Sequence, residues 1–162
     1  MTQFTNKTVV VTGGTDGIGR ALVLNLLALG ANVVTCGRSQ QKILALEAEA
    51  PMGKICVLNA DVSVEKDCER LVDHAVKMFG GIDVLINNAG ISMRGLMEDG
   101  GTGIIPVIKK VMDINFYGAM YCTTFALPHL IKSKGVVVGV SSIAGYRGLP
   151  GRSGYSASKF AL

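Results

Sequence analysis

Short apolar runs alternate along the chain with longer stretches of helical periodicity. The apolar runs, rich in valine and isoleucine, predict strands at residues 8–11, 32–36, 54–58, 82–86 and 136–140. The longer stretches predict helices at residues 18–29, 40–50, 64–79, 104–132 and 155–162. Strands that are apolar throughout are typical of a parallel sheet covered by helices on both faces.

Glycine and proline separate these elements. Gly30 and Pro51 each follow a predicted helix. Pro128 marks a bend or an end within the last long helical stretch. The glycine-rich residues 93–103 predict a loop. The alternation as a whole predicts an α/β fold, a Rossmann-like doubly wound parallel sheet formed by one domain that comprises residues 1–162.

Composition restricts the classes of function. The 162 residues are 49% hydrophobic and 17% charged, with a formal net charge of +4, which suits a compact core. The chain has no lysine- or arginine-rich block and few aromatic residues, so we expect no nucleic-acid partner. Its start does not resemble a signal peptide, and no apolar run has the length of a membrane span. We therefore expect a cytoplasmic protein with no membrane partner.

The potential metal ligands are scattered along the sequence. The cysteines lack C-x-x-C spacing and lie in apolar or helical segments: Cys36, Cys56, Cys68 and Cys122. His74 and His129 are isolated and lack metal-ligand spacing. We expect buried thiols in a reducing compartment and no bound metal.

A glycine-rich turn between the first predicted strand and helix carries the first candidate chemistry. Gly13 permits a sharp turn, Gly17 permits close approach of a pyrophosphate, and Gly19 permits tight helix–sheet packing. The amide groups and the positive end of the following helix favour an anion. We expect cofactor contacts from Gly13, Thr15, Asp16, Gly17, Ile18 and Gly19. The alternative is an ordinary glycine-rich turn, and the missing P-loop lysine disfavours a nucleotide triphosphatase.

The loop after the second predicted strand bears on the choice of nicotinamide cofactor. In dinucleotide folds an acid here binds the ribose 2′-hydroxyl, whereas a basic residue accommodates a 2′-phosphate. Gly37 occupies the acidic position, and Arg38 and Ser39 follow with a guanidinium and a hydroxyl that suit phosphate. We therefore predict NADP(H) and favour NAD(H) less. Asp16 would weaken phosphate binding if its charge points inward.

A tyrosine and a lysine near the end of the sequence form the second candidate site. Tyr155 and Lys159 are four residues apart, so they share one face of a helix and can point into one cleft. A phenol is a poor base at neutral pH, and an adjacent ammonium favours its ionised form. The alternative is an exposed helical pair without catalytic function. Ser141 and Ser142 end the fifth predicted strand, a usual place for functional residues in an open sheet.

These motifs in this order resemble the short-chain dehydrogenase/reductase superfamily. The resemblance extends from Lys7 to Leu162 and depends on T-G-x-x-x-G-x-G, N-A-D-V, N-N-A-G and Y-x-x-x-K, with a serine thirteen residues before the tyrosine. It implies that Asp61 and Val62 border the adenine ring of the cofactor. It further implies that Asn88, Ala89 and Gly90 lie along the cofactor.

The resemblance also implies a catalytic set of Asn115, Ser142, Tyr155 and Lys159. In the family, the asparagine holds a water that relays protons, and the serine polarises the substrate carbonyl. The tyrosine transfers the hydroxyl proton, and the lysine supports the tyrosine and binds the nicotinamide ribose. Met93 and Arg94 are weaker candidates for substrate contact.

The sequence therefore predicts an oxidoreductase that transfers a hydride between NADP(H) and a small-molecule carbonyl or secondary alcohol. One alternative is a truncated chain that binds NADP(H) without turnover. Another is an epimerase or dehydratase on the same framework. Parts of the sequence most resemble a broad subgroup related to steroid and retinoid reductases, which does not identify a substrate.

Family members continue well beyond the tyrosine–lysine helix. We therefore expect the domain to be incomplete at its C-terminus, with the last strands and helices missing and residues 136–140 forming an apolar sheet edge. The resemblance implies a homo-oligomer for a full-length chain.

Overall fold

A five-stranded parallel sheet forms the centre of the molecule. The computed structural model describes residues 3–96 and 103–162. Its strands are β1 (Thr8–Val11), β2 (Asn32–Gly37), β3 (Ile55–Asn59), β4 (Val84–Asn87) and β5 (Val136–Gly139). The order across the sheet is β3-β2-β1-β4-β5, and every neighbouring pair is parallel. The chain thus winds outward from β1 in one direction and then from β4 in the other, which confirms the doubly wound fold.

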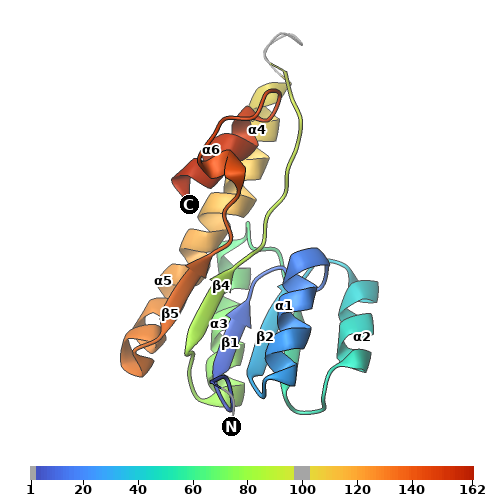
Figure 1. Cartoon of the computed structure of the whole chain (residues 1–162), viewed down its shortest axis with the longest axis vertical. Helices are drawn as coiled ribbons and strands as arrows, with labels where there is room; N and C mark the ends of the chain where they lie inside the picture. The colour runs from blue at the N-terminus through green and yellow to red at the C-terminus, as the bar shows by residue number, and fades with distance from the viewer. Residues whose placement is uncertain (1–2, 97–102) are drawn as a thin grey trace.

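Helices cover both faces of this sheet (Figure 1). They are α1 (Gly17–Ala28), α2 (Gln40–Glu49), α3 (Glu65–Phe79), α4 (Ile104–Met112), α5 (Gly118–Ser133) and α6 (Ser153–Ala161). Val9, Val11 and Val33 pack in a core with α1 and α2. Val10 and Val34, the alternating strand residues, pack in a second core with α3 and α5. The uniformly apolar strands therefore follow from burial on both sides.

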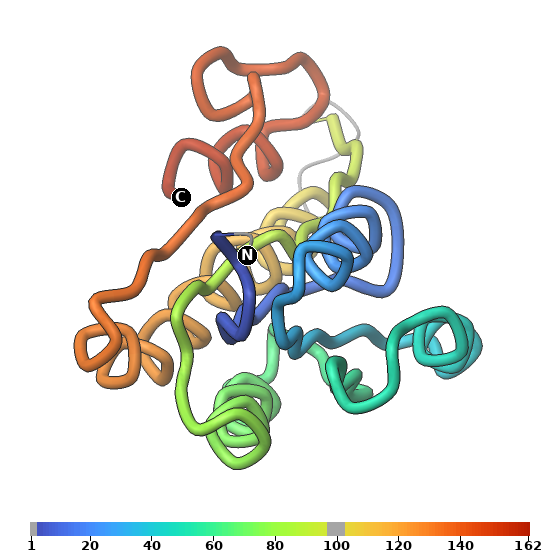
Figure 2. The backbone as a smooth tube through the Cα atoms, turned by 60° about the horizontal axis from the view of Figure 1, so that its bottom comes forward, coloured from blue at the N-terminus to red at the C-terminus, as the bar shows by residue number. Residues whose placement is uncertain are grey.

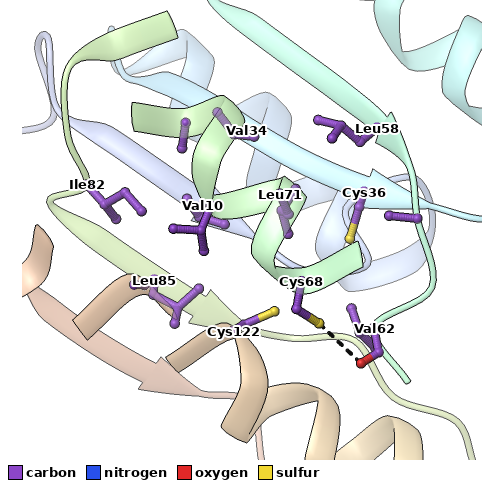
Figure 3. Packing of buried hydrophobic residues seen from close by; sticks show 14 of the residues in the cluster. Val10, Val34, Cys36, Leu58, Val62, Cys68, Leu71, Ile82, Leu85 and Cys122 are labelled. Carbon is purple, nitrogen blue, oxygen red and sulfur yellow. Dashed lines mark hydrogen bonds between the residues drawn. The ribbon is translucent and has the colours of Figure 1, made fainter. Parts of the chain in front are cut away.

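The second core is close-packed and contains three of the four cysteines. Cys36, Cys68 and Cys122 are buried with Leu71 and Leu85 between the sheet, α3 and α5 (Figure 3). All four cysteines are free; Cys36, Cys68 and Cys122 are buried as predicted, whereas Cys56 is only partly buried. Burial raises the pKa of Cys36 to about 11, so this thiol stays protonated at neutral pH.

The long helical stretch predicted at residues 104–132 is continuous but not uniform. A five-residue π-helix (Asp113–Tyr117) joins α4 to α5, which carries the helix on to Ser133. Pro128 lies inside α5, so this proline does not end the helix, which was one of the two predicted outcomes. The predicted helix at residues 155–162 begins earlier, at Ser153, and a short 3₁₀ helix (Ile143–Gly145) precedes it.

Strand β5 forms one edge of the sheet and pairs with β4. Val136, Val137 and Val138 are 55%, 43% and 41% exposed, which is the apolar edge that the sequence predicted. Beyond the carboxyl ends of the strands, α4 and α6 pack against each other (Figure 1). Figures 1 and 2 both show α6 and α2 at opposite sides of the molecule. Any site that includes both helices must therefore be long.

Candidate active site

A cleft of about 590 Å³ runs along the carboxyl ends of the strands, from α2 to α6. It lies where the strand order reverses between β1 and β4, the usual ligand site of an open α/β sheet. All residues for which the sequence predicts cofactor contact line it: Gly13, Thr15, Asp16, Gly17, Ile18, Gly19, Arg38, Ser39, Asp61, Val62, Asn88, Ala89, Gly90, Tyr155 and Lys159.

The turn after β1 has the backbone shape that the glycine spacing predicts. Gly13 and Gly17 have φ values of 67° and 50°, which favour glycine. A Cβ atom on Gly17 would meet open space, so a ligand can approach this backbone. A Cβ atom on Gly19 would lie 2.3 Å from the carbonyl oxygen of Gly13, so only glycine fits there. Asp16 caps α1 by accepting the N–H of Gly17 at 2.9 Å.

Hydrogen bonds from Thr12 and Asn88 hold this turn against the end of β4. The Thr12 hydroxyl oxygen accepts the N–H groups of Asn88 and Ala89, each at 3.0 Å. The Asn88 amide donates to the carbonyl oxygens of Thr12 at 2.9 Å and Gly13 at 3.3 Å. The N-N-A-G segment thereby fixes the position of the glycine turn.

Two ion pairs lie at the α2 end of the cleft. Nη1 of Arg38 is 3.4 Å from Oδ2 of Asp61, and Nζ of Lys42 pairs with Oδ2 of Asp16. Ser39 caps α2 by accepting the N–H of Lys42 at 3.5 Å. Lys42 lines the cleft, although the sequence analysis did not identify it. Its place in the first turn of α2, three residues after the cap, was the only available signal.

Asp61 accepts several hydrogen bonds at the end of β3. Although its partial burial raises the pKa of Asp61, the N–H and hydroxyl of Ser63, at 3.0 and 2.7 Å, and the guanidinium of Arg38 lower it. The net effect is a pKa below the usual value of an aspartate. The charged form of this side chain therefore stabilises the folded protein.

We expect the replacement Asp61→Asn to lower the thermal midpoint at neutral pH and to have little effect below about pH 3. Because folding lowers the pKa of Asp61, its stabilisation is present above about pH 4 and is lost as the pH falls through the folded-state value. Thermal unfolding across this range measures the effect, with Asp73→Asn, an exposed carboxylate of α3, as the control. A difference between wild type and Asp61→Asn that is unchanged by acid would contradict the assignment.

Tyr155 and Lys159 line the opposite end of the cleft on one face of α6. Lys159 is buried and donates from Nζ to the carbonyl oxygen of Val140 at 2.7 Å. Burial lowers the pKa of Lys159. The residue that follows β5 therefore holds the ammonium of Lys159 within the cleft lining.

Asn115 lies in the π-helix and is 1% exposed. Its Oδ1 accepts the N–H of Ile91 at 2.8 Å, and its Nδ2 donates to the carbonyl of Ile91 at 2.9 Å and the hydroxyl of Ser158 at 2.9 Å. A Cβ atom on Gly90 would lie 3.3 Å from Oδ1 of Asn115 and 3.5 Å from Nζ of Lys159. Three segments distant in sequence thus meet at Gly90.

The structure distinguishes the two serines after β5. Ser141 lines the cleft and donates its hydroxyl to the carbonyl of Lys159 at 3.2 Å. Ser142 is partly buried beside the cleft, and its hydroxyl oxygen caps the 3₁₀ helix by accepting the N–H of Ala144 at 3.1 Å. The structure therefore brings Tyr155 and Lys159 together in the cleft lining but leaves Ser142 outside it.

Hydrogen bonds join the segment after N-N-A-G to the loop before α6. Arg152 donates from Nη1 to the hydroxyl of Ser92 at 2.5 Å, and the N–H of Gly95 donates to the carbonyl of Gly151 at 3.0 Å. Ser92 lines the cleft, whereas the predicted substrate residue Arg94 is exposed beside Gly151. Part of the predicted loop at 93–103, residues 97–102, lies outside the described residues.

Within residues 3–96 and 103–162, no group of three or more histidine, cysteine or acidic side chains could hold a metal ion. The described helices include none that is both long and apolar enough to cross a membrane.

The family model for short chain dehydrogenases matches residues 7–162. The chain belongs to this family. Among curated proteins, it is 37% identical over 159 residues to 11-beta-hydroxysteroid dehydrogenase-like 4A of Arabidopsis thaliana, a match that covers 96% of the chain and 52% of that protein. It is 33% identical over 160 residues to meso-2,3-butanediol dehydrogenase of Serratia marcescens, covering 99% of the chain and 62% of that protein. The chain thus spans about half to two thirds of the length of these relatives.

Solved structures of the same family superpose closely on this dehydrogenase-family chain. A short-chain dehydrogenase/reductase of unknown function from Caenorhabditis elegans, solved with cofactor, has a TM-score of 0.88 and 32% identity and covers 98% of this chain and 61% of that one. A glucose/ribitol dehydrogenase from Brucella melitensis has a TM-score of 0.91 and 34% identity, and the match covers 99% of this chain and 67% of that one.

Proposed function

We propose that the protein is an oxidoreductase that uses NADP(H) to interconvert a small-molecule carbonyl compound and a secondary alcohol. The observation that carries the proposal is one continuous cleft with Arg38 and the glycine turn at one end and Tyr155 with Lys159 at the other. An extended dinucleotide requires a phosphate site and a reactive site at opposite ends of one cleft. The dehydrogenase names of the relatives support the same class of reaction.

The residues of the cleft fit a dinucleotide. The open space at Gly17 lets a pyrophosphate approach the first turn of α1, where backbone N–H groups lack partners within the helix. Asp61 and Val62 would border the adenine ring, and Asn88, Ala89 and Gly90 would flank the middle of the ligand, since all five residues line the cleft. When bound, the nicotinamide ring accepts or donates the hydride.

The side chains at the α6 end would handle the proton. Tyr155 is the residue that gives or takes the proton at the substrate oxygen, because its phenol group lines the cleft. Lys159, held by the carbonyl of Val140, would supply the positive charge that favours the ionised phenol and would bind the nicotinamide ribose. Ser142 would polarise the substrate carbonyl by donating its hydroxyl proton, which stays free because the oxygen accepts the N–H of Ala144. Asn115 would position the Lys159 side of the site through Ile91 and Ser158.

The α2 end of the cleft favours a 2′-phosphate over a 2′-hydroxyl. A Cβ atom on Gly37 would lie 2.1 Å from Oγ1 of Thr15, so the acid that would bind a free 2′-hydroxyl does not fit at this position. The Arg38 side chain is 58% exposed and lies beside the cleft, where it can turn toward a phosphate.

Thermal unfolding with each cofactor tests this choice. We expect NADPH to raise the midpoint more than NADH, because a ligand that binds the folded state stabilises it according to its affinity. Arg38→Gln should remove most of that difference, through loss of about 1.5–3 kcal/mol from a charge-assisted hydrogen bond. A larger shift with NADH would overturn the choice of NADP(H). No shift with either cofactor would overturn the cofactor site itself.

A second candidate is a chain that binds NADP(H) without turnover. The observation that favours it is the position of Ser142, which does not line the cleft. Binding of NADPH without turnover of any carbonyl substrate would support this candidate.

A further inference from the structure

Two separate ion pairs, each of one cation and one carboxylate, line the α2 end of the cleft. Lys42 pairs with Asp16, and Arg38 pairs with Asp61. All four side chains line the cleft. The pairs are exposed or partly exposed, and such pairs are weak and screened by solvent. An incoming dianion can therefore replace the carboxylates as the partner of both cations.

We infer that Lys42 is a second determinant of phosphate specificity, which binds the 2′-phosphate of the cofactor together with Arg38, and that Asp16 weakens this binding by competing for Lys42. The inference rests on the proposed function. The sequence places an acid, Asp16, in the glycine turn, where its charge opposes a phosphate. The fold compensates for the charge of Asp16 by bringing the ammonium of Lys42, from α2, into an ion pair with it.

The position of each charge follows from local structure. Asp16 is fixed because its Oδ1 caps α1 at the N–H of Gly17, which leaves Oδ2 for Lys42. Lys42 lies in the first turn of α2, three residues after the Ser39 cap, and lines the cleft. The ammonium of Lys42 and the N–H of Gly17 lower the pKa of Asp16, so Asp16 is charged at neutral pH and competes with a phosphate for Lys42.

Binding measurements with four ligands test the inference by calorimetry on the purified protein. The ligands are NADPH, NADH, adenosine 2′,5′-bisphosphate and adenosine 5′-monophosphate. Lys42→Gln should raise the Kd for the two ligands with a 2′-phosphate roughly tenfold and leave the other two within about twofold. Asp16→Asn keeps the helix cap but removes the charge, so it should lower the Kd for NADPH roughly two- to fivefold.

Lys77→Gln is the matched control, since Lys77 is an exposed lysine of α3, which packs on the opposite face of the sheet from α2. It should leave all four values unchanged. If the wild type binds NADPH but Lys42→Gln changes the Kd of all four ligands equally, or changes none, the proposed role of Lys42 is overturned. A wild type that binds none of the four ligands would overturn the proposed function as well. Weaker NADPH binding by Asp16→Asn would overturn the competing role of Asp16.

Discussion

Replacing Tyr155 by phenylalanine is expected to lower kcat roughly 10²- to 10⁴-fold, the usual contribution of a positioned general acid or base. The phenol group lines the cleft, and the described hydrogen bonds of this residue involve its backbone carbonyl, which accepts the hydroxyl of Ser158 at 2.7 Å. Phenylalanine retains the ring and the backbone contact. The substitution should therefore leave the fold and the Kd for NADPH nearly unchanged while it removes the transferable proton.

Steady-state turnover of a carbonyl substrate, with NADPH absorbance as the readout, measures this loss. Tyr146→Phe is the matched control, because Tyr146 is 87% exposed and does not line the cleft. Unchanged turnover in Tyr155→Phe would remove the assigned role of Tyr155. A loss that arises only from a higher KM would assign the phenol group to substrate binding instead.

Replacing Asn115 by alanine is expected to lower the free energy of unfolding by about 2–4 kcal/mol, because the backbone N–H and C=O of Ile91 lose their partner together. The amide also joins the π-helix to α6 through the hydroxyl of Ser158. For a chain of this size, the loss corresponds to a fall in Tm of roughly 5–15 °C. Chemical denaturation and thermal unfolding measure both quantities.

Asn25→Ala makes the same substitution at an exposed site of α1, where the side chain bonds only to the carbonyl of Ala21 among the described contacts. It should change the stability by less than about 0.5 kcal/mol. An Asn115→Ala variant as stable as Asn25→Ala would show that the contacts with Ile91 and Ser158 are not structural. The remaining explanation for Asn115 would then be a role in the chemistry alone.

The alternating apolar runs predicted all five strands. Burial on both faces explains the apolar residues of β1, β2 and β4, whereas the valines of β5 are exposed at the sheet edge. Several predicted ends of the strands differ from the observed ends by one or two residues. Strand β4 begins at Val84 rather than at residue 82, and β2 extends to Gly37. The ends of strands depend on partners across the sheet, such as the register of Gly37 with Asn59, which no local pattern encodes.

Pro128 and the π-helix illustrate a second limit. A proline interior to a helix removes one hydrogen bond, and the sequence pattern therefore indicated a bend or an end. In the structure, α5 continues past Pro128 because Ala126 and Leu130 on either side are buried against the sheet and α3. The π-helix that holds Asn115 depends on its contacts with Ile91 and Ser158, which are 24 and 43 residues away.

The sequence by itself determined the fold class and the family and predicted part of the cleft lining, since the glycine turn, N-N-A-G and Y-x-x-x-K are local patterns with fixed spacing. Only the tertiary structure paired Lys42 with Asp16 and brought Ser141 rather than Ser142 into the lining. The reason is physical. Local patterns fix backbone shape and helix faces, whereas contacts between distant segments depend on how the helices pack on the sheet.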